Sequence, residues 1–383
     1  KIKTRYLKKI IKKDMNWIKI IFVNIVITFS LLGMILMAPP IVYSIYKIAK
    51  KQTFNFDTLD SRSFLELYEG YDWVDQHFLE FGKLPTSYHD YFVWRRNDYS
   101  GSTINIKNGL RKTSNLVNEN DEIPKYWFFG GSTTWGTGVN DEYTYPSLFA
   151  KKTNSYVTNF GESGYIARQS LAYLNNYLLN HAINDMTNIN VIFYDGVNEV
   201  SNRCRWEIDG LGTGREAQIK DNLKNYEQFS FSRTFNQLQY LLTKIAQKLA
   251  KDNSDSASTN SLYDCASDKT RAKEVAETLV DTWELVSGIV KNRGGKFTAI
   301  LQPVAFYGNP EVGYLDLTSS KNLAAQYKAI YPLIIEAAAR RNIKFIDMTG
   351  LYDNCTNCYI DYCHVGPQGH QLLVSSLVSY LNE

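Results

Sequence analysis

The sequence contains few cysteines, few histidines and no strong excess of charge of either sign. Its 383 residues include five Cys, five His and nine Pro, and the formal net charge is +3. Hydrophobic residues make up 44% of the chain and charged residues 21%, which excludes an intrinsically disordered or collagen-like protein. No internal repeat is visible. The composition is therefore that of an ordinary globular chain.

The charge is distributed unevenly. Residues 1–20 carry eight basic side chains against the single acid Asp14, a local balance of +7, which leaves −4 for the rest of the chain. A mildly acidic body is a poor binder of polyanions. We therefore expect no nucleic-acid partner, in spite of a sequence isoelectric point near 8.4.

An uncharged stretch follows this basic head, since no charged side chain lies between Lys19 and Lys47. At 1.5 Å per residue, about 20 residues cross a bilayer core of roughly 30 Å. We expect residues 1–19 to form a cytoplasmic head and residues 20–46 to form one retained transmembrane anchor. A cleaved signal peptide would need a shorter apolar core and an A-x-A-like site, and a buried soluble helix would rarely be so long without charge.

The positive-inside rule then places everything beyond the anchor on the outer side of the inner or plasma membrane, in the periplasm or outside the cell. The five cysteines all lie in this outer part: Cys204, Cys265, Cys355, Cys358 and Cys363. An oxidising compartment permits disulfides, and the odd number leaves at least one cysteine without a partner inside the chain. Cys363 could pair with Cys204, Cys265 or Cys358. A zinc site built on these cysteines is a weaker alternative, so we expect no metal and no cofactor.

From residue 125 onward, short apolar runs alternate with longer helical patterns. The predicted strands are residues 126–129, 156–160, 191–194, 297–301 and 343–346, and the predicted helices are residues 145–151, 167–181, 271–291, 322–341 and 367–381. Such alternation indicates an α/β fold with a parallel sheet covered on both faces.

The remaining segments are assigned relative to this main domain, residues 121–383. Residues 47–120 are expected to be a lead-in packed on it, with a helix over 64–81 and a mixed polar and aromatic segment at 88–96. Residues 204–265 interrupt the alternation as an insertion that contains an exposed loop at 251–258.

Polar side chains follow the first three predicted strands, where an open α/β sheet places its chemistry. Gly130-Gly131-Ser132 offers a serine at a strand-to-helix turn, with free backbone N–H groups at the helix start. An ordinary helix cap is the alternative, and a phosphate loop lacks its Gly-Lys-Ser/Thr ending. Asn159-x-Gly161-x-x-Gly164 follows the second strand, and Asn198, after the third, carries an amide that can face a developing negative charge or simply form a turn.

A fourth element precedes the last predicted helix. Asp361 stands three residues before His364, so that its carboxylate can orient the imidazole while the imidazole takes a proton from a serine. A capping aspartate beside a surface histidine is the alternative.

Together these four elements, in this order, resemble the SGNH/GDSL hydrolase superfamily over residues 125–383. The resemblance implies a three-layer α/β/α, flavodoxin-like domain with Ser132, His364 and Asp361 as the catalytic triad. It further implies an oxyanion hole formed by the N–H groups of Ser132 and Gly164 and the Asn198 amide. Gly131 and Glu199 replace the aspartates of the family's first and third blocks. Residues 130–141 also resemble bacterial, membrane-anchored members associated with envelope polysaccharides.

The resemblance implies a serine esterase or deacetylase that acts on O-acyl esters, with an O-acylated glycan of the cell envelope as substrate. Trp135 and Tyr165, next to the two glycine-rich turns, are the predicted substrate contacts. Two alternatives remain open. An O-acyltransferase would use the same triad with a multi-span membrane partner that supplies the acyl group, and a catalytically silent glycan-binding assembly factor would keep only the fold.

Overall fold

The computed structural model describes residues 17, 19, 22–31, 60–120, 122–205, 212, 213, 216 and 263–382. The chain divides into two compact units, residues 1–55 with 219–258 and residues 56–218 with 259–383. Residues 22–31 of the first unit are helical. In the part of the chain that is described, no helix has the length and apolar character of a membrane span. The basic head and most of the predicted anchor and insertion lie outside the described residues.

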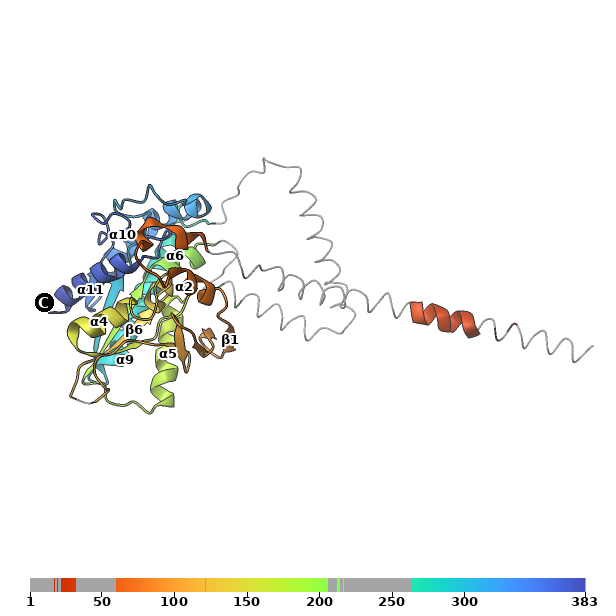
Figure 1. The fold of residues 1–383 in the computed structure, drawn as a ribbon, viewed down its shortest axis with the longest axis horizontal. Helices are drawn as coiled ribbons and strands as arrows, with labels where there is room; N and C mark the ends of the chain where they lie inside the picture. The colour runs from red at the N-terminus through yellow and green to blue at the C-terminus, as the bar shows by residue number, and fades with distance from the viewer. Residues whose placement is uncertain are drawn as a thin grey trace, which may run out of the picture. The chain divides into compact units, whose positions relative to one another are not determined.

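An eight-stranded sheet forms the centre of the second unit, in the order β10-β9-β8-β6-β7-β5-β4-β3 (Figure 1). The strands are β3 Tyr99–Ser100, β4 Asn105–Lys107, β5 Leu110–Arg111, β6 Lys125–Gly130, β7 Tyr156–Asn159, β8 Ile189–Asp195, β9 Lys296–Leu301 and β10 Phe345–Asp347. β6 to β10 are mutually parallel, as their apolar runs predict. β3, β4 and β5 add an antiparallel extension beside β7, which the sequence did not predict.

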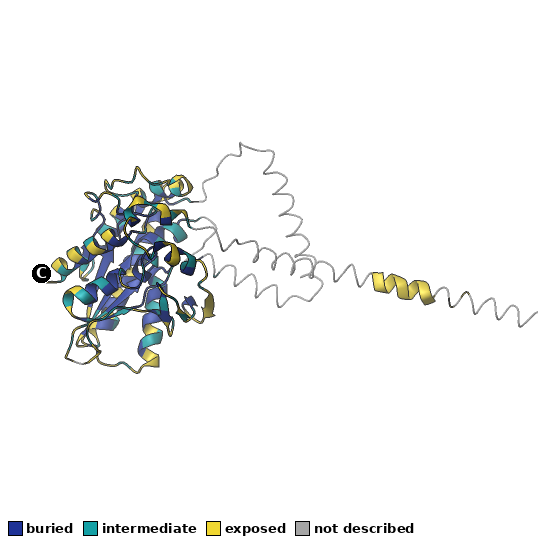
Figure 2. Cartoon of the chain, in the orientation of Figure 1, coloured by how far each residue is buried: buried dark blue, intermediate teal, exposed yellow. Residues whose placement is uncertain are grey.

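Helices cover both faces of this sheet. The helices are α2 Val74–Phe81, α3 Ser132–Trp135, α4 Tyr145–Thr153, α5 Ala167–Asn180, α6 Val197–Arg203, α9 Lys269–Lys291, α10 Ala324–Ala339 and α11 Pro367–Asn382, with 3-10 turns η1 Ser61–Phe64, η2 Glu66–Tyr68 and η3 Thr318–Leu323. α4 packs against α11, and α9 packs against both α5 and α10. Figure 2 shows the strands buried between helices whose outer sides are exposed.

The strand order creates a switch point at β6. The chain passes from β6 to its neighbour β7, and then returns to β8 on the other side of β6. Connections that leave in opposite directions place α4 and α5 on opposite faces, and the carboxyl end of β6 is then the position where open α/β sheets place their sites. The residue that follows this strand and its glycine turn is Ser132.

The lead-in differs from its prediction in detail. Only Val74–Phe81 of the expected helix over 64–81 is α-helical, since two 3-10 turns and Gly70, at φ +85°, precede it. Residues 88–96 belong to a hairpin of β1 Thr86–His89 and β2 Val93–Arg96.

Candidate active site

The turn after β6 presents Ser132 at the first position of α3. Gly130 has φ +148°, and a Cβ there would overlap the Thr134 hydroxyl and the Tyr194 carbonyl, so this turn requires glycine. Ser132 is partly exposed, whereas the rest of α3 is buried. Its N–H belongs to the first turn of a helix, where no preceding intrahelical acceptor exists. The local geometry thus holds one accessible hydroxyl above a rigid turn.

The three predicted triad side chains form one continuous hydrogen-bonded chain. Nε2 of His364 lies 2.6 Å from Oγ of Ser132, and Nδ1 lies 2.7 Å from Oδ2 and 2.9 Å from Oδ1 of Asp361. Asp361 and His364 occupy one short turn, and Oδ1 also accepts the backbone N–H groups of Cys363 and His364. The turn therefore fixes the carboxylate, and the carboxylate fixes the ring with Nε2 toward the serine.

The charge state of Asp361 suits this arrangement. Burial alone would raise the pKa of its carboxyl group. The charge and hydrogen bond of the His364 ring, and then the Arg62 guanidinium, act more strongly together and hold this pKa far below its usual range. Asp361 is therefore ionised at neutral pH and can stabilise a protonated imidazole.

The turn that carries Gly164 and the helix that carries Asn198 meet beside Ser132. Nδ2 of Asn198 donates a 2.7 Å hydrogen bond to the Tyr165 carbonyl, and a Cβ on Gly131 would overlap the same nitrogen. The amide thus lies against the residue that precedes Ser132, with its second N–H available. Gly164 has φ +80°, and its N–H donates to no described residue. These groups are the donors that the sequence predicted for an oxyanion hole.

Two buried acids support the Asn198 helix. Glu199 accepts the N–H of Gly196 at 3.0 Å and that of Ala167 at 2.6 Å, which joins the start of α6 to the start of α5. Asp195 accepts the indole N–H of Trp283 at 3.0 Å. Burial raises the pKa of both carboxyls, and the charge of Glu199 raises that of Asp195 further. Glu199, which stands where the resemblance expects an aspartate, therefore acts as a clamp around Asn198.

Trp135 and Tyr165, the predicted substrate contacts, are each only 1% exposed, so their side chains offer almost no surface to a substrate. The guanidinium groups of Arg96 and Arg111 lie over the Trp135 ring, at 4.1 and 4.3 Å from its centroid. The Tyr165 hydroxyl donates to the Trp94 carbonyl at 2.5 Å. Both rings belong to the packing beneath the site, since position next to a functional turn does not determine exposure.

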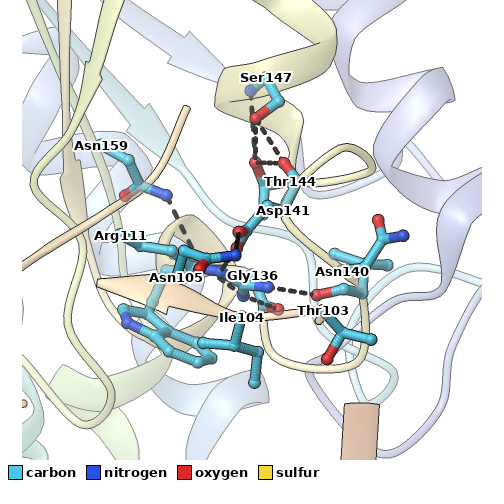
Figure 3. Close-up of polar contacts among 12 residues, drawn as sticks. Thr103, Ile104, Asn105, Arg111, Gly136, Asn140, Asp141, Thr144, Ser147 and Asn159 are labelled. Atoms are coloured by element: carbon cyan, nitrogen blue, oxygen red, sulfur yellow. Dashed lines mark hydrogen bonds and ion pairs between the residues drawn. The ribbon is translucent and has the colours of Figure 1, made fainter. Parts of the chain in front are cut away.

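A buried polar network under α3 comes from the lead-in (Figure 3). Arg111 on β5 donates to the Asp141 carboxylate at 2.9 Å and to the carbonyls of Gly136 and Val139 at 2.6 and 2.7 Å. Asn105 donates to the other oxygen of Asp141 at 3.0 Å. Arg96 pairs with Glu162, which is fully buried in the turn after β7. The lead-in thus fixes both the turn that carries Ser132, called the nucleophile turn, and the turn after β7 that carries Gly164, called the oxyanion turn.

Gln302 and Arg62 are two further contacts to the site that the sequence interpretation missed. Gln302, directly after β9, donates to the Thr133 hydroxyl at 2.8 Å and to the Cys363 carbonyl at 3.3 Å, so it connects α3 with the histidine turn. The sequence signal that could have identified Gln302 is a polar residue directly after a strand. Arg62 donates to Asp361 at 2.9 Å from a segment without a recognisable pattern.

The cysteines form two disulfides, Cys204–Cys265 and Cys355–Cys358, and Cys363 remains a buried free thiol. The considered pairing of Cys363 is therefore wrong. Asp361, Cys363 and His364 are the one group of three potential metal-ligating side chains found among the described residues. Both ring nitrogens of His364 already have partners in Asp361 and Ser132, so this group fits a proton relay better than a metal site.

Comparisons with known proteins give matches among solved structures. No family model matches the chain, and no curated protein matches it significantly. A G-D-S-L lipolytic protein from Veillonella parvula is 13% identical with a TM-score of 0.40, over 68% of this chain and 98% of its own. A carbohydrate acetylesterase family member from Sinorhizobium meliloti is 14% identical with a TM-score of 0.38, over 68% and 100%. A putative arylesterase from Agrobacterium tumefaciens is 16% identical with a TM-score of 0.35, over 68% and 99%. At this level of similarity, the function of the site has to be argued from its own contacts.

Proposed function

We propose that this chain is an SGNH-type serine esterase that removes O-acyl groups. The observation that carries the proposal is the chain of hydrogen bonds from Ser132 through His364 to Asp361 at the carboxyl end of β6. A nucleophile within 2.6 Å of a base, with that base oriented by a carboxylate, is the arrangement that activates a serine hydroxyl. The ordinary helix-cap alternative does not require a histidine at this position.

The reaction proceeds through an acyl-enzyme. Nε2 of His364 takes the proton of the Ser132 hydroxyl while Oγ bonds to the ester carbonyl carbon. The C–O bond to the leaving alcohol then breaks, and the imidazolium returns the proton to that alcohol. Water next attacks the acyl-serine, His364 accepts its proton, and the acid leaves as Ser132 regains a hydrogen.

The negative charge that develops on the carbonyl oxygen needs fixed donors. We assign this role to the backbone N–H groups of Ser132 and Gly164 and to the free N–H of the Asn198 amide. The clamp of Glu199 on α6 and the pairing of Arg96 with Glu162 keep these donors in place before substrate arrives. Such preorganisation is the main source of catalysis by an oxyanion hole, and one donor contributes roughly 2.7–4 kcal/mol.

An envelope glycan is the substrate class that we propose. A groove of about 560 Å³ lies between the β1–β2 hairpin and the second half of α5, so it would hold a part of a long substrate that is remote from the reacting ester. Arg95, Arg96 and Asp98 line it together with the rings of Tyr177 and His181 and four amides: Asn97, Asn108, Asn176 and Asn180. Amides that bond hydroxyl groups, beside rings that stack, suit a neutral sugar chain.

We further propose that the chain is anchored by residues 20–46 and works outside the cytoplasm. Two disulfides support this location, because disulfides persist in oxidising compartments. The basic head and the uncharged stretch that follows it support the orientation.

The proposal is tested on the full chain in a mild detergent with a fluorophosphonate probe and a small acetyl ester. We expect labelling and acetate release, both lost in Ser132→Ala and both kept in Ser375→Ala, a control on the exposed side of α11. Labelling without hydrolysis would instead favour the acyltransferase, which excludes water. A folded protein without labelling would refute an active triad and favour the silent assembly factor.

A further inference from the structure

Arg62, in the 3-10 turn η1, contacts the triad carboxylate from outside the motif-bearing part of the chain. One terminal nitrogen of its guanidinium donates to Oδ2 of Asp361 at 2.9 Å. The same oxygen accepts Nδ1 of His364 at 2.7 Å. The two positively polarised groups therefore share one carboxylate oxygen, whereas Oδ1 is held by backbone N–H groups of its own turn.

Asp60 holds the other side of this guanidinium. Its Oδ1 accepts Nε of Arg62 at 2.9 Å and its Oδ2 accepts the second terminal nitrogen at 2.7 Å. The guanidinium carbon also lies 5.3 Å from the centre of the Phe78 ring. All three nitrogens of Arg62 are thus engaged with two carboxylates, so this side chain is not free to bind an anionic substrate.

The other titratable side chains around His364 are neutral at pH values near 7. Burial raises the pKa of the Tyr68 phenol and of the Cys363 thiol, and it lowers the pKa of His77 and brings that of His370 to about 3. The neighbouring Cys363, and then burial, raise the pKa of Tyr362. Among the described residues, the charges that face the imidazole are therefore those of Asp361, Arg62 and Asp60.

We propose that Arg62 is a positioning residue: it shares Oδ2 of the Asp361 carboxylate with His364 and so weakens the support that this carboxylate gives to a protonated imidazole, with Asp60 as the counter-charge that limits this effect. The inference rests on the proposed function and deepens it. With Arg62 present, one cation balances two carboxylates. The Asp361 carboxylate therefore stabilises the charged imidazolium less than it would if Arg62 were absent. The proton affinity of the base is thus set in part by a segment about 300 residues away in the sequence.

Opposite shifts are expected from the two partners. Arg62→Gln leaves two carboxylates near the imidazole, which stabilises its charged form, and we expect the acidic limb of kcat/KM to move up by about one pH unit. Asp60→Asn removes one negative charge while Arg62 stays, so the limb is expected to move down, by about half a unit. Arg62→Lys keeps the charge and is expected to lie close to the unaltered protein.

The experiment is a pH–rate profile of the full chain with a small acetyl ester, for the unaltered protein and these three variants. Shifts of opposite sign for Arg62→Gln and Asp60→Asn support the proposal, because a merely structural role would lower the rate at every pH without moving the limb. Shifts of the same sign, or no shift, overturn it. If Arg62→Gln fails to fold, the direction in which Asp60→Asn moves the acidic limb of the pH–rate profile still tests the proposal.

A second measurement separates this inference from the proposed function. The full chain contains five histidines, so the His364 ring can be titrated by NMR after histidine labelling and assigned with His364→Asn. If no ester is hydrolysed, the esterase proposal fails, and the ring titration still tests Arg62. An upward shift of the His364 midpoint in Arg62→Gln and a downward shift in Asp60→Asn then support the proposal, and equal midpoints refute it.

Discussion

Gly131→Ala provides the sharpest test of how the site is built. The backbone of Gly131, at φ −82° and ψ −151°, is extended with a negative φ and so is not the left-handed conformation that favours glycine. A Cβ there would nevertheless overlap Nδ2 of Asn198 and stand 3.5 Å from the Tyr165 carbonyl that holds the same amide. We expect the amide to retreat by about 1 Å to restore van der Waals contact. A displacement of this size should lower kcat/KM by about 100-fold, or about 2.7 kcal/mol.

The assay compares single and double variants on an acetyl ester. Asn198→Ala alone should lower kcat by about 100- to 1000-fold. If Gly131→Ala acts through that amide, the double variant Gly131→Ala/Asn198→Ala should be no slower than Asn198→Ala alone, to within about threefold. Gly288→Ala is the matched control, since a Cβ at that helical glycine meets no atom within 4 Å.

Two results would refute this reasoning. Full activity in Gly131→Ala would mean that the overlap is relieved without moving the amide. A double variant whose loss equals the product of the two single losses would mean that Gly131 acts by a route independent of Asn198. Unchanged thermal unfolding of Gly131→Ala is the necessary companion measurement, because the expected defect lies in the rate and not in the fold.

Four further predictions concern stability and burial. Arg111→Met should reduce the free energy of unfolding in urea by about 3–5 kcal/mol, since it leaves Asp141 buried without its counter-charge. Adding Asp141→Asn should restore part of that free energy. A loss below about 1 kcal/mol would contradict a structural role for the Arg111–Asp141 pair. Because the pKa of Asp361 is depressed in the folded state, its contribution to stability is complete above an ordinary aspartate pKa near 4 and is lost as the pH falls through the folded value. Asp361→Asn should therefore be less stable at neutral pH, and the difference should shrink on acidification below pH 4, as thermal unfolding across that range would show. Replacing Cys204 and Cys265 by serine should cost about 2–4 kcal/mol, and Cys363, at 4% exposure, should react with a thiol reagent only on unfolding; rapid labelling of Cys363 in the folded protein would be inconsistent with its burial.

The central sheet could be predicted because its strands carry strong local signals. β6 and β8 are apolar on both faces, and each is followed at once by a glycine turn and a polar residue. Since parallel strands end at one edge of the sheet, polar residues directly after them are expected to meet there, as Ser132 and Asn198 do. The order of the four blocks along the chain then indicated that His364 would join them. The meeting of Ser132 and Asn198 followed from chain order and strand direction, whereas the joining of His364 to them was implied by the resemblance.

The lead-in could not be predicted in the same way. β3 and β5 have only two residues each, too few for any periodicity, and they form through pairing with β4 and β7. The contact of Arg62 with Asp361 spans a separation that no local pattern reports. Trp135 was predicted to face a substrate for a related reason. Its ring is covered by Arg96 on β2 and Arg111 on β5, and neither contact has a local sequence signal.

The buried pairs Arg111–Asp141 and Arg96–Glu162 also bear on where the smallest stable fragment begins. A chain cut at residue 120 would keep all four blocks of the resemblance. It would lose both ion pairs together with the lead-in residues that cover the two acids, among them Arg111, Asn105 and Arg96, so this part of the interior would be exposed to water. We therefore expect a fragment that begins near residue 125 to be less stable than one that also contains the segment from Asp60, whose Arg62 pairs with Asp361.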